Sequence, residues 1–221
     1  NLYSEKVIYL PKIWNAHCGF DFERKENPPP FIKNKYFTFG SFNNLSKINE
    51  NVIQCWAKIL KNIKNSKLII KCPSDQHRLT RIEKSFKEKG VLDSVILYTR
   101  IDDKKDHLDL YKKVDIALDT FPYNGVTTSF EAIWMGVPVL TMAGYNFNSR
   151  CGESINKNLN MEQLIAKDED DYIKKVVHLM NNTDEYVNIR KSIFLNAINS
   201  PLFDTEDYAK SFFESLRKIV Q

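Results

Sequence analysis

The sequence predicts an α/β fold built on an open, doubly wound parallel sheet and followed by C-terminal helices. Two observations predict it. Strand-like and helix-like segments alternate strictly between residues 36 and 142. The strand-like segments are also apolar on both faces, as at residues 68–70 and 116–118, which is typical of a parallel sheet covered by helices on both sides.

The individual elements follow from hydrophobic periodicity and from the residues that interrupt it. Residues 6–10 are expected to form a short strand, and Pro28 to Pro30 mark an extended linker. Further strands are expected at residues 36–40, 67–72, 94–98, 114–118 and 137–142. Helices are expected at residues 49–63, 75–89, 104–113 and 127–135, and after residue 150 at 168–180, 183–196 and 205–220. Thr183 and Thr205 are expected to be N-caps.

Composition excludes several classes of protein. The chain has 221 residues, 43% of them hydrophobic and 27% charged, so it can bury a substantial core. Its net charge is +4 and residues of both signs alternate, which argues against a nucleic-acid partner and suits a small phosphate-bearing ligand. No apolar run approaches the ~20 residues of a membrane span, and no stretch resembles a signal peptide.

The four cysteines predict a reduced environment. Cys18, Cys55, Cys72 and Cys151 form no C-x-x-C pair and no zinc-finger spacing. We therefore expect free thiols in a cytoplasmic protein, with Cys55 and Cys72 in the core.

The strongest candidate site follows the strand that ends at residue 118, because ligands of such sheets bind beyond the carboxyl ends of the strands. There a turn-rich loop leads to Gly125, Thr127 and Thr128, which open a helix. The first N–H groups of a helix are unpaired and suit phosphate. Glu131, one turn further on, is placed to accept hydrogen bonds from sugar hydroxyls. The alternative is that Thr127 caps the helix and Glu131 is a surface acid.

Two other loops carry candidate residues. Lys47 follows small polar residues after the strand at 36–40 and is either a point charge for a diphosphate or a solvated lysine. Lys104 and His107 lie three residues apart near a helix start, where a surface pair is the default interpretation. Walker, dinucleotide-binding, nucleophile-elbow and metal-ligand motifs are absent from the sequence.

Taken together and in this order, the three segments resemble the C-terminal lobe of the O-GlcNAc transferase and SPINDLY family of glycosyltransferases. The matching text lies at residues 38–47, 115–125, 127–128 and 131–144, with shorter matches at 3–6, 10–11, 149–150 and 200–203. The resemblance implies a GT-B enzyme, in which two Rossmann-like lobes enclose the active site. It assigns residues 1–35 to the end of the N-terminal lobe and a linker, 36–200 to the nucleotide-sugar-binding lobe, and 201–221 to a helix packing back toward the N-terminal lobe.

The resemblance also implies roles for residues that match the family motif. Lys47 would neutralise the diphosphate of the donor and so help the leaving group depart, with Asn44 close to the phosphates. Gly125, Thr127 and Thr128 would cradle the phosphates at the start of the helix. Because a lysine and a helix N-terminus supply the positive charge, no metal ion or other cofactor is expected.

The remaining assigned residues would hold the nucleoside. Glu131 lies where an acid binds the ribose. Lys104 and His107 match positions that contact the nucleotide, with the backbone of Asp102 near the base.

Three departures from the family pattern leave the donor open. Val126 replaces a histidine of the animal enzymes, Asn44 a glutamine, and Leu110 a base-contacting arginine. We expect a UDP-GlcNAc-type donor, with a GDP-fucose-type donor as the alternative.

The acceptor is expected to be Ser or Thr of a protein. It would be engaged through an N-terminal lobe and helical repeats that this sequence does not contain, and glycans or lipids are the alternative acceptors. The chain, which starts at Asn1, is expected to be a piece of a longer enzyme and inactive alone. A non-catalytic nucleotide-binding or interaction module is the remaining alternative.

Overall fold

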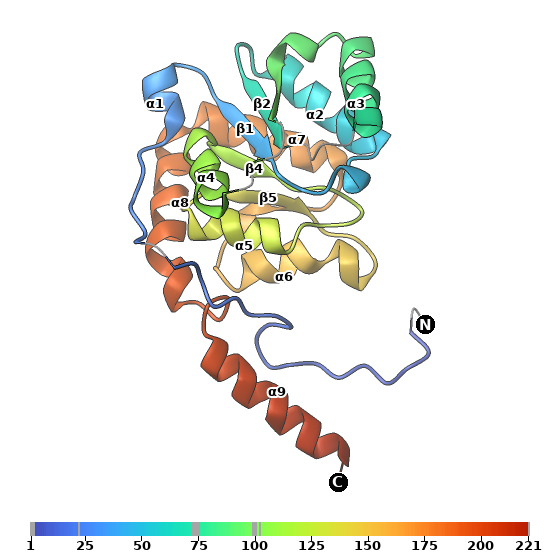
Figure 1. Cartoon of the computed structure of the whole chain (residues 1–221), viewed down its shortest axis with the longest axis vertical. Helices are drawn as coiled ribbons and strands as arrows, with labels where there is room; N and C mark the ends of the chain where they lie inside the picture. Colours follow the sequence, from blue (N-terminus) through green and yellow to red (C-terminus); the bar gives the residue numbers. More distant parts are fainter. Residues whose placement is uncertain (1–2, 22, 72–75, 99–100, 102, 221) are drawn as a thin grey trace.

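The computed structural model describes residues 3–21, 23–71, 76–98, 101 and 103–220 (Figure 1). In these ranges six strands form one parallel sheet in the order β3-β2-β1-β4-β5-β6. The strands are β1 (Thr38–Ser41), β2 (Lys67–Lys71), β3 (Val95–Tyr98), β4 (Ile116–Leu118), β5 (Val139–Met142) and β6 (Ile165–Ala166). The chain runs outward from β1 to β3 and then returns to place β4 beside β1, so the strand order reverses between β1 and β4.

Helices lie on both faces of this sheet (Figure 1). They are α1 (Pro30–Asn34), α2 (Glu50–Asn62), α3 (Gln76–Glu88), α4 (Lys104–Asp109), α5 (Thr127–Trp134), α6 (Cys151–Lys157), α7 (Glu169–Asn181), α8 (Thr183–Asn196) and α9 (Thr205–Val220). Helix α2 packs against α3 and α7, and α5 packs against α8. No helix in the described ranges is both long and apolar enough to cross a bilayer.

The core is the apolar interior of this sheet and helix sandwich. Phe39 of β1, Leu68 of β2 and Ile116 of β4 are fully buried, and so are Trp56 of α2 and Tyr172 of α7. Strands that are apolar on both faces are covered on both faces, which confirms the predicted parallel sheet.

Local capping explains where the long helices begin. The Asn49 side chain accepts a hydrogen bond from the Val52 amide at 3.0 Å and so starts α2. The Asp168 carboxylate accepts one from the Asp171 amide at 2.8 Å and so starts α7. Glycines at positive φ, Gly90 at 67° and Gly136 at 72°, follow α3 and α5, as the sequence predicts.

A buried carboxylate connects α1 to the sheet. Asp115, just before β4, accepts hydrogen bonds from the amides of Phe31 at 3.1 Å and Thr38 at 2.8 Å. Tyr186 of α8 donates to it at 3.1 Å, and Arg190 donates to the Val114 and Asp115 carbonyls. Burial raises the pKa of Asp115. Helix α1 and the start of β1 are therefore attached to the amino end of the strand whose carboxyl end leads into the candidate site.

The amino-terminal segment differs from the prediction. Residues 6–10 form no strand, because they follow the surface near α6 and α9 and pair with no strand of the sheet. Pro30 begins α1 instead of continuing an extended linker, since a proline at the first helical position gives up an N–H that would be unpaired anyway.

Two predicted caps are wrong. Asn182 precedes α8 without a side-chain cap, and Thr183 is already helical. Asp204 caps α9 by accepting a hydrogen bond from the Asp207 amide at 3.0 Å, so Thr205 does not. Helix α6 and strand β6 were not expected at all.

The cysteine assignments have mixed outcomes. Cys55 is buried as predicted, whereas Cys72 lies outside the described residues. Cys151, for which no core position was predicted, is also buried. The thiols of Cys18, Cys55 and Cys151 are all free.

Candidate functional site

The candidate site lies where β1 and β4 end, at the reversal of the strand order. The loop after β1 contains the 3₁₀ turn η1 (Leu45–Lys47), and the loop after β4 leads into α5. The two loops are tied together, because the Asn49 side chain donates to the Phe121 carbonyl at 2.8 Å.

Lys47 points at the loop that precedes α5. Its Nζ donates to the Asn124 carbonyl at 2.8 Å and lies 4.1 Å from the centre of the Tyr123 ring. Burial lowers the pKa of Lys47. The ammonium group is therefore directed into the site and is not a freely solvated surface charge.

Asn44 shapes the turn that carries Lys47. Its side-chain oxygen accepts hydrogen bonds from the backbone amide of Ser46 at 3.0 Å and from the Ser46 hydroxyl at 2.9 Å. In this structure the Asn44 side chain caps η1, and its assignment to the donor phosphates stays a prediction.

Helix α5 begins without a side-chain cap. Val126 occupies the N-cap position and makes no capping hydrogen bond, so Thr127 is not the cap that the alternative interpretation required. Thr127 is exposed at the first helical position. An uncapped first turn leaves N–H groups available to an anion and carries a partial positive charge.

Gly125 and Thr128 interact with the protein itself. The Gly125 amide donates to Asp119 at 2.6 Å, and a Cβ at Gly125 would lie 2.7 Å from both Asn43 Oδ1 and Thr128 Oγ1. The Thr128 hydroxyl donates to Asn43 Oδ1 at 2.8 Å. The Thr128 proton, which the sequence analysis assigned to a phosphate, is therefore used within the protein, and the glycine is needed for internal packing.

Asp119 is a buried acid beneath the start of α5. It accepts hydrogen bonds from the amides of Thr120 and Gly125, from Thr141 Oγ1 at 2.7 Å and from Asn43 Nδ2 at 3.4 Å. Burial raises the pKa of Asp119 to about 6, although its hydrogen bonds and Lys47 act in the opposite direction.

Glu131 and His107 belong to a second cluster. His107 Nε2 lies 3.0 Å from Glu131 Oε2, and Lys71 Nζ lies 2.8 Å from His107 Nδ1. An ammonium group only donates, so Nδ1 accepts and Nε2 carries the proton that is donated to Glu131. Tyr111 also donates to Glu131, at 3.1 Å. Glu131 is therefore neither a cap nor a free surface acid.

Lys104 and His107 do not form a pair. Lys104 is exposed at the start of α4, with its Nζ 4.9 Å from the centre of the Phe20 ring, while His107 faces Lys71 and Glu131. Asp102 lies outside the described residues.

Sequence reasoning gave no role to several residues that organise the site. These are Asn43, Lys71, Tyr111, Asp119 and Asn124. An acid directly after an apolar strand was the available signal for Asp119, whereas the partners of Lys71 and Tyr111 lie too far away in sequence to be paired by spacing.

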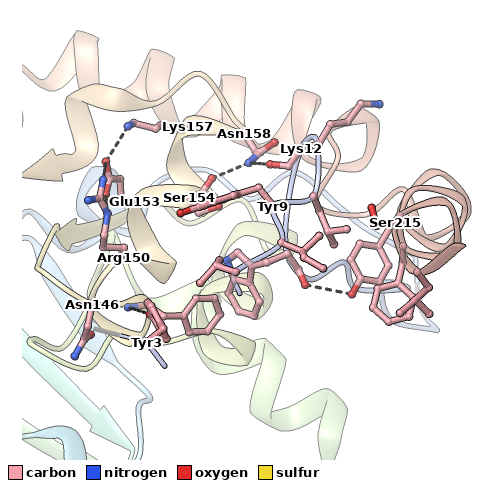
Figure 2. Close-up of a pocket in the computed structure, with 18 of the residues that line it drawn as sticks. Tyr3, Tyr9, Lys12, Asn146, Arg150, Glu153, Ser154, Lys157, Asn158 and Ser215 are labelled. Atoms are coloured by element: carbon pink, nitrogen blue, oxygen red, sulfur yellow. Dashed lines mark hydrogen bonds and ion pairs between the residues drawn. The ribbon is translucent and has the colours of Figure 1, made fainter. Parts of the chain in front are cut away.

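Two further properties of the described residues bear on chemistry. They contain no group of three or more His, Cys, Asp or Glu side chains placed to hold a metal ion. A groove of about 910 Å³ lies away from Lys47, between residues 3–14, α6 and α9 (Figure 2). In it Arg150 and Lys157 pair with Glu153, and Tyr208 donates to the Trp14 carbonyl at 3.2 Å.

Comparison with curated proteins finds relatives named as peptide N-acetylglucosaminyltransferases. A probable UDP-N-acetylglucosamine–peptide N-acetylglucosaminyltransferase SPINDLY from Hordeum vulgare is 37% identical over 221 residues, 97% of this chain and 23% of that protein. The UDP-N-acetylglucosamine–peptide N-acetylglucosaminyltransferase of Caenorhabditis elegans is 31% identical over 77% of this chain and 15% of its own length. This chain thus spans about a quarter of the length of the first of these relatives, 23%.

Comparison with solved structures agrees. A mutant O-GlcNAc transferase from Thermobaculum terrenum matches 99% of this chain and 43% of its own chain, with a TM-score of 0.82 at 25% identity. TarM of S. aureus matches with a TM-score of 0.68 at 13% identity, over 97% of this chain and 40% of TarM, which shows the shared fold alone. The predicted Rossmann-like lobe of the GT-B type is confirmed.

The model of glycosyl transferase family 41 matches residues 31–212, most of the chain. Together with the relatives above, it confirms the resemblance drawn from the sequence motifs. The chain therefore belongs to glycosyltransferase family 41.

Proposed function

We propose that this chain is the nucleotide-sugar-binding lobe of a protein O-glycosyltransferase that uses a UDP-GlcNAc-type donor and Ser or Thr acceptors. Two relatives that carry this activity in their names, at 37% and 31% identity, support the choice of donor and of a peptide acceptor.

One geometric observation carries the proposal. The Lys47 ammonium lies 2.8 Å from the Asn124 carbonyl, immediately before the uncapped start of α5. An ammonium group has three donors, so those not used by Asn124 remain for a phosphate oxygen. Lysine and helix N-terminus together form a site for a pyrophosphate at the reversal of the strand order.

The same arrangement suits glycosyl transfer. The acceptor hydroxyl attacks the anomeric carbon and releases its proton, the bond from that carbon to the β-phosphate oxygen breaks, and the nucleoside diphosphate leaves. Negative charge develops on the leaving oxygen, where Lys47 and the first turn of α5 stabilise it. We propose that donor binding needs no metal ion, so EDTA should leave the affinity for UDP unchanged.

Calorimetric titration of this chain with UDP tests the site. Lys47→Ala should weaken UDP binding roughly 10–100-fold, the value of a hydrogen bond between charged groups. Lys64→Ala, which removes an exposed lysine at the opposite end of the sheet, is the matched control and should bind as the wild type does. Equal affinity of the two variants would contradict the proposed phosphate site.

The nucleotide is the open part of this proposal. Leu110 is only 3% exposed, so it offers a base no polar contact at a position where the animal enzymes have an arginine. Titration with GDP and GDP-fucose beside UDP and UDP-GlcNAc decides the donor class. Tighter binding of the GDP compounds would replace the UDP-GlcNAc assignment and leave the phosphate site in place.

A non-catalytic module is distinguished in the full-length protein. If the chain serves transfer, Lys47→Ala abolishes sugar transfer to peptide. If it is a scaffold, the same variant leaves the protein's role unchanged. The isolated chain should bind nucleotide but transfer no sugar, and turnover by it in a radiolabelled assay would refute this.

We further propose that the groove of Figure 2 is covered by an N-terminal lobe, which with helical repeats would engage the protein acceptor. Phe212, Leu216 and Ile219 expose an apolar stripe of α9 to it. In the full-length enzyme, Phe212→Asp with Leu216→Asp should abolish transfer and spare UDP binding. Lys210→Glu, on the same helix but not in the groove lining, is the control.

A cytoplasmic location completes the proposal. It is supported by the free thiols of Cys18, Cys55 and Cys151, and cell fractionation tests it.

A further inference from the structure

The carboxylate of Asp119 is surrounded by hydrogen-bond donors of two kinds. Its Oδ1 accepts from backbone amides, Gly125 at 2.6 Å and Thr120 at 2.9 Å, and from Asn43 Nδ2 at 3.4 Å. Its Oδ2 accepts from Thr141 Oγ1 at 2.7 Å. Backbone amides can only donate, whereas a hydroxyl can donate or accept. A proton on Asp119 is therefore accommodated on Oδ2, with Thr141 as its acceptor, and the amide contacts at Oδ1 are kept.

Few groups near Asp119 change charge close to neutral pH. Lys47 on η1, Cys151 on α6 and Tyr172 on α7 interact with it electrostatically. Burial raises the pKa of Cys151 to about 11 and that of Tyr172 well above its usual value, so both stay neutral. Lys47 is the positive charge that faces Asp119, and Asp119 itself has a pKa of about 6.

An anion at the start of α5 changes this balance. Gly125, whose amide already binds Asp119, directly precedes the first turn proposed to hold the pyrophosphate. The pyrophosphate would also draw on Lys47, the counter-charge of Asp119. Asp119 is only 2% exposed, so a second negative charge nearby repels its carboxylate strongly, and protonation of Asp119 removes that repulsion.

We propose that binding of a pyrophosphate at the start of α5 is coupled to the uptake of one proton from solvent by Asp119 Oδ2. The inference rests on the proposed function, because it takes the phosphate site as given. It makes Asp119 a positioning residue, which holds the Gly125 loop through Oδ1 and adjusts the charge of the site through Oδ2.

Calorimetric titration of the chain with UDP-GlcNAc, in buffers of different ionisation enthalpy, measures this uptake directly. The pyrophosphate of UDP-GlcNAc is a diester, so the ligand itself takes up no proton near neutral pH. We expect uptake approaching one proton, and an affinity that rises up to tenfold per unit as pH is lowered from about 8 to about 6.5.

Asp119→Asn imitates the protonated acid. The new amide oxygen can still accept from Gly125 and Thr120, and the new amide nitrogen can donate to Thr141 Oγ1. This variant should take up no proton and bind UDP-GlcNAc at least as tightly as the wild type at pH 8, independently of pH. Asp184→Asn, an exposed acid of α8, should behave as the wild type does.

Other outcomes overturn the inference. Proton uptake that persists in Asp119→Asn would assign the proton to another group, such as Lys47. Weakened, still pH-dependent binding would leave Asp119 a purely structural role. Binding of UDP-GlcNAc without proton uptake would contradict this inference but leave the proposed function in place. The absence of any nucleotide binding would contradict the proposed function itself.

A second measurement does not depend on ligand binding. Carboxyl ¹³C NMR of the free chain should show Asp119 titrating with a midpoint near 6. The amide signal of Gly125, which donates to Asp119, should shift with the same midpoint. A midpoint in the ordinary range of aspartate would overturn the inference even if the variant failed to fold.

Discussion

The two ends of β4 carry the same residue type in different surroundings. Asp115 precedes the strand and Asp119 follows it, and burial raises the pKa of both. At Asp115 each carboxylate oxygen accepts from a backbone amide, that of Phe31 or Thr38. At Asp119 the amides gather on one oxygen and the other faces a hydroxyl. A proton on Asp115 would compete with an amide donor at either oxygen, whereas Asp119 can gain a proton on Oδ2 without losing its amide contacts.

The largest expected effect is a loss of stability caused by a substitution at the Asp115 end of β4. Asp115→Asn must turn its amide nitrogen toward the N–H of either Phe31 or Thr38, which leaves a donor unpaired. It also leaves the buried Arg190 without its nearby negative charge. The free energy of unfolding should fall by about 3–5 kcal/mol, measured by urea denaturation. A loss below about 1 kcal/mol would show that the Asp115 and Asp119 ends of β4 tolerate an Asp→Asn substitution equally well.

For Asp119→Asn we expect the loss of stability to depend on pH and to be smallest near neutral pH. The pKa of Asp119 in the folded chain, about 6, lies above its ordinary 3.8, so the bound proton stabilises the fold at low pH. That contribution is complete below the ordinary pKa and is lost as pH rises through 6. The stability of the wild type relative to the variant should therefore decline from pH 4 to pH 7, by at most about 3 kcal/mol. A stability difference between wild type and variant that stays constant from pH 4 to pH 7 would contradict a pKa of about 6 for Asp119.

A smaller change sharpens the comparison at the Asp119 end. Thr141→Val removes the hydroxyl that donates to Oδ2 and should cost about 1–2 kcal/mol in urea denaturation. A charged acceptor gains more from that bond than a neutral one, so the pKa of Asp119 should rise. The ¹³C titration of the carboxyl group measures that shift, and a lowered midpoint would be inconsistent with it.

The matching change at the Asp115 end should have the smallest effect. Tyr186→Phe removes a donor to Asp115 but leaves both backbone amides in place. Stability should fall by about 1 kcal/mol, with UDP affinity unchanged. Weakened UDP binding in this variant would mean that the two ends of β4 are not independent.

The sequence predicts the sheet well because its signals are local. Apolar runs such as Leu68 to Ile70 and the glycines at 90 and 136 carry their structural preference within a few residues. Helix α6 was not predicted, because its seven residues, Cys151–Lys157, contain too few apolar side chains to show a helical hydrophobic periodicity. Strand β6 has only two residues, which is too short to show the alternating or continuous apolar pattern that predicts a strand.

The candidate site is only partly predictable, because its partners are distant in sequence. Spacing suggested that Lys104 and His107 act together, yet His107 bonds to Lys71 and Glu131, residues on other elements. Thr128 was recognised, but its hydroxyl is directed to Asn43. Side-chain pairing across the switch point depends on the register of β1 against β4, which no single segment encodes.

Strand β4 has three residues, which span roughly 10 Å at the usual rise per residue. Asp115 at its amino end holds α1 through Phe31 and the start of β1 through Thr38, and Asp119 at its carboxyl end holds the loop before α5 through Gly125. The hydrogen bonds at its two ends make β4 the short spacer that sets the distance between α1 and the loop before α5.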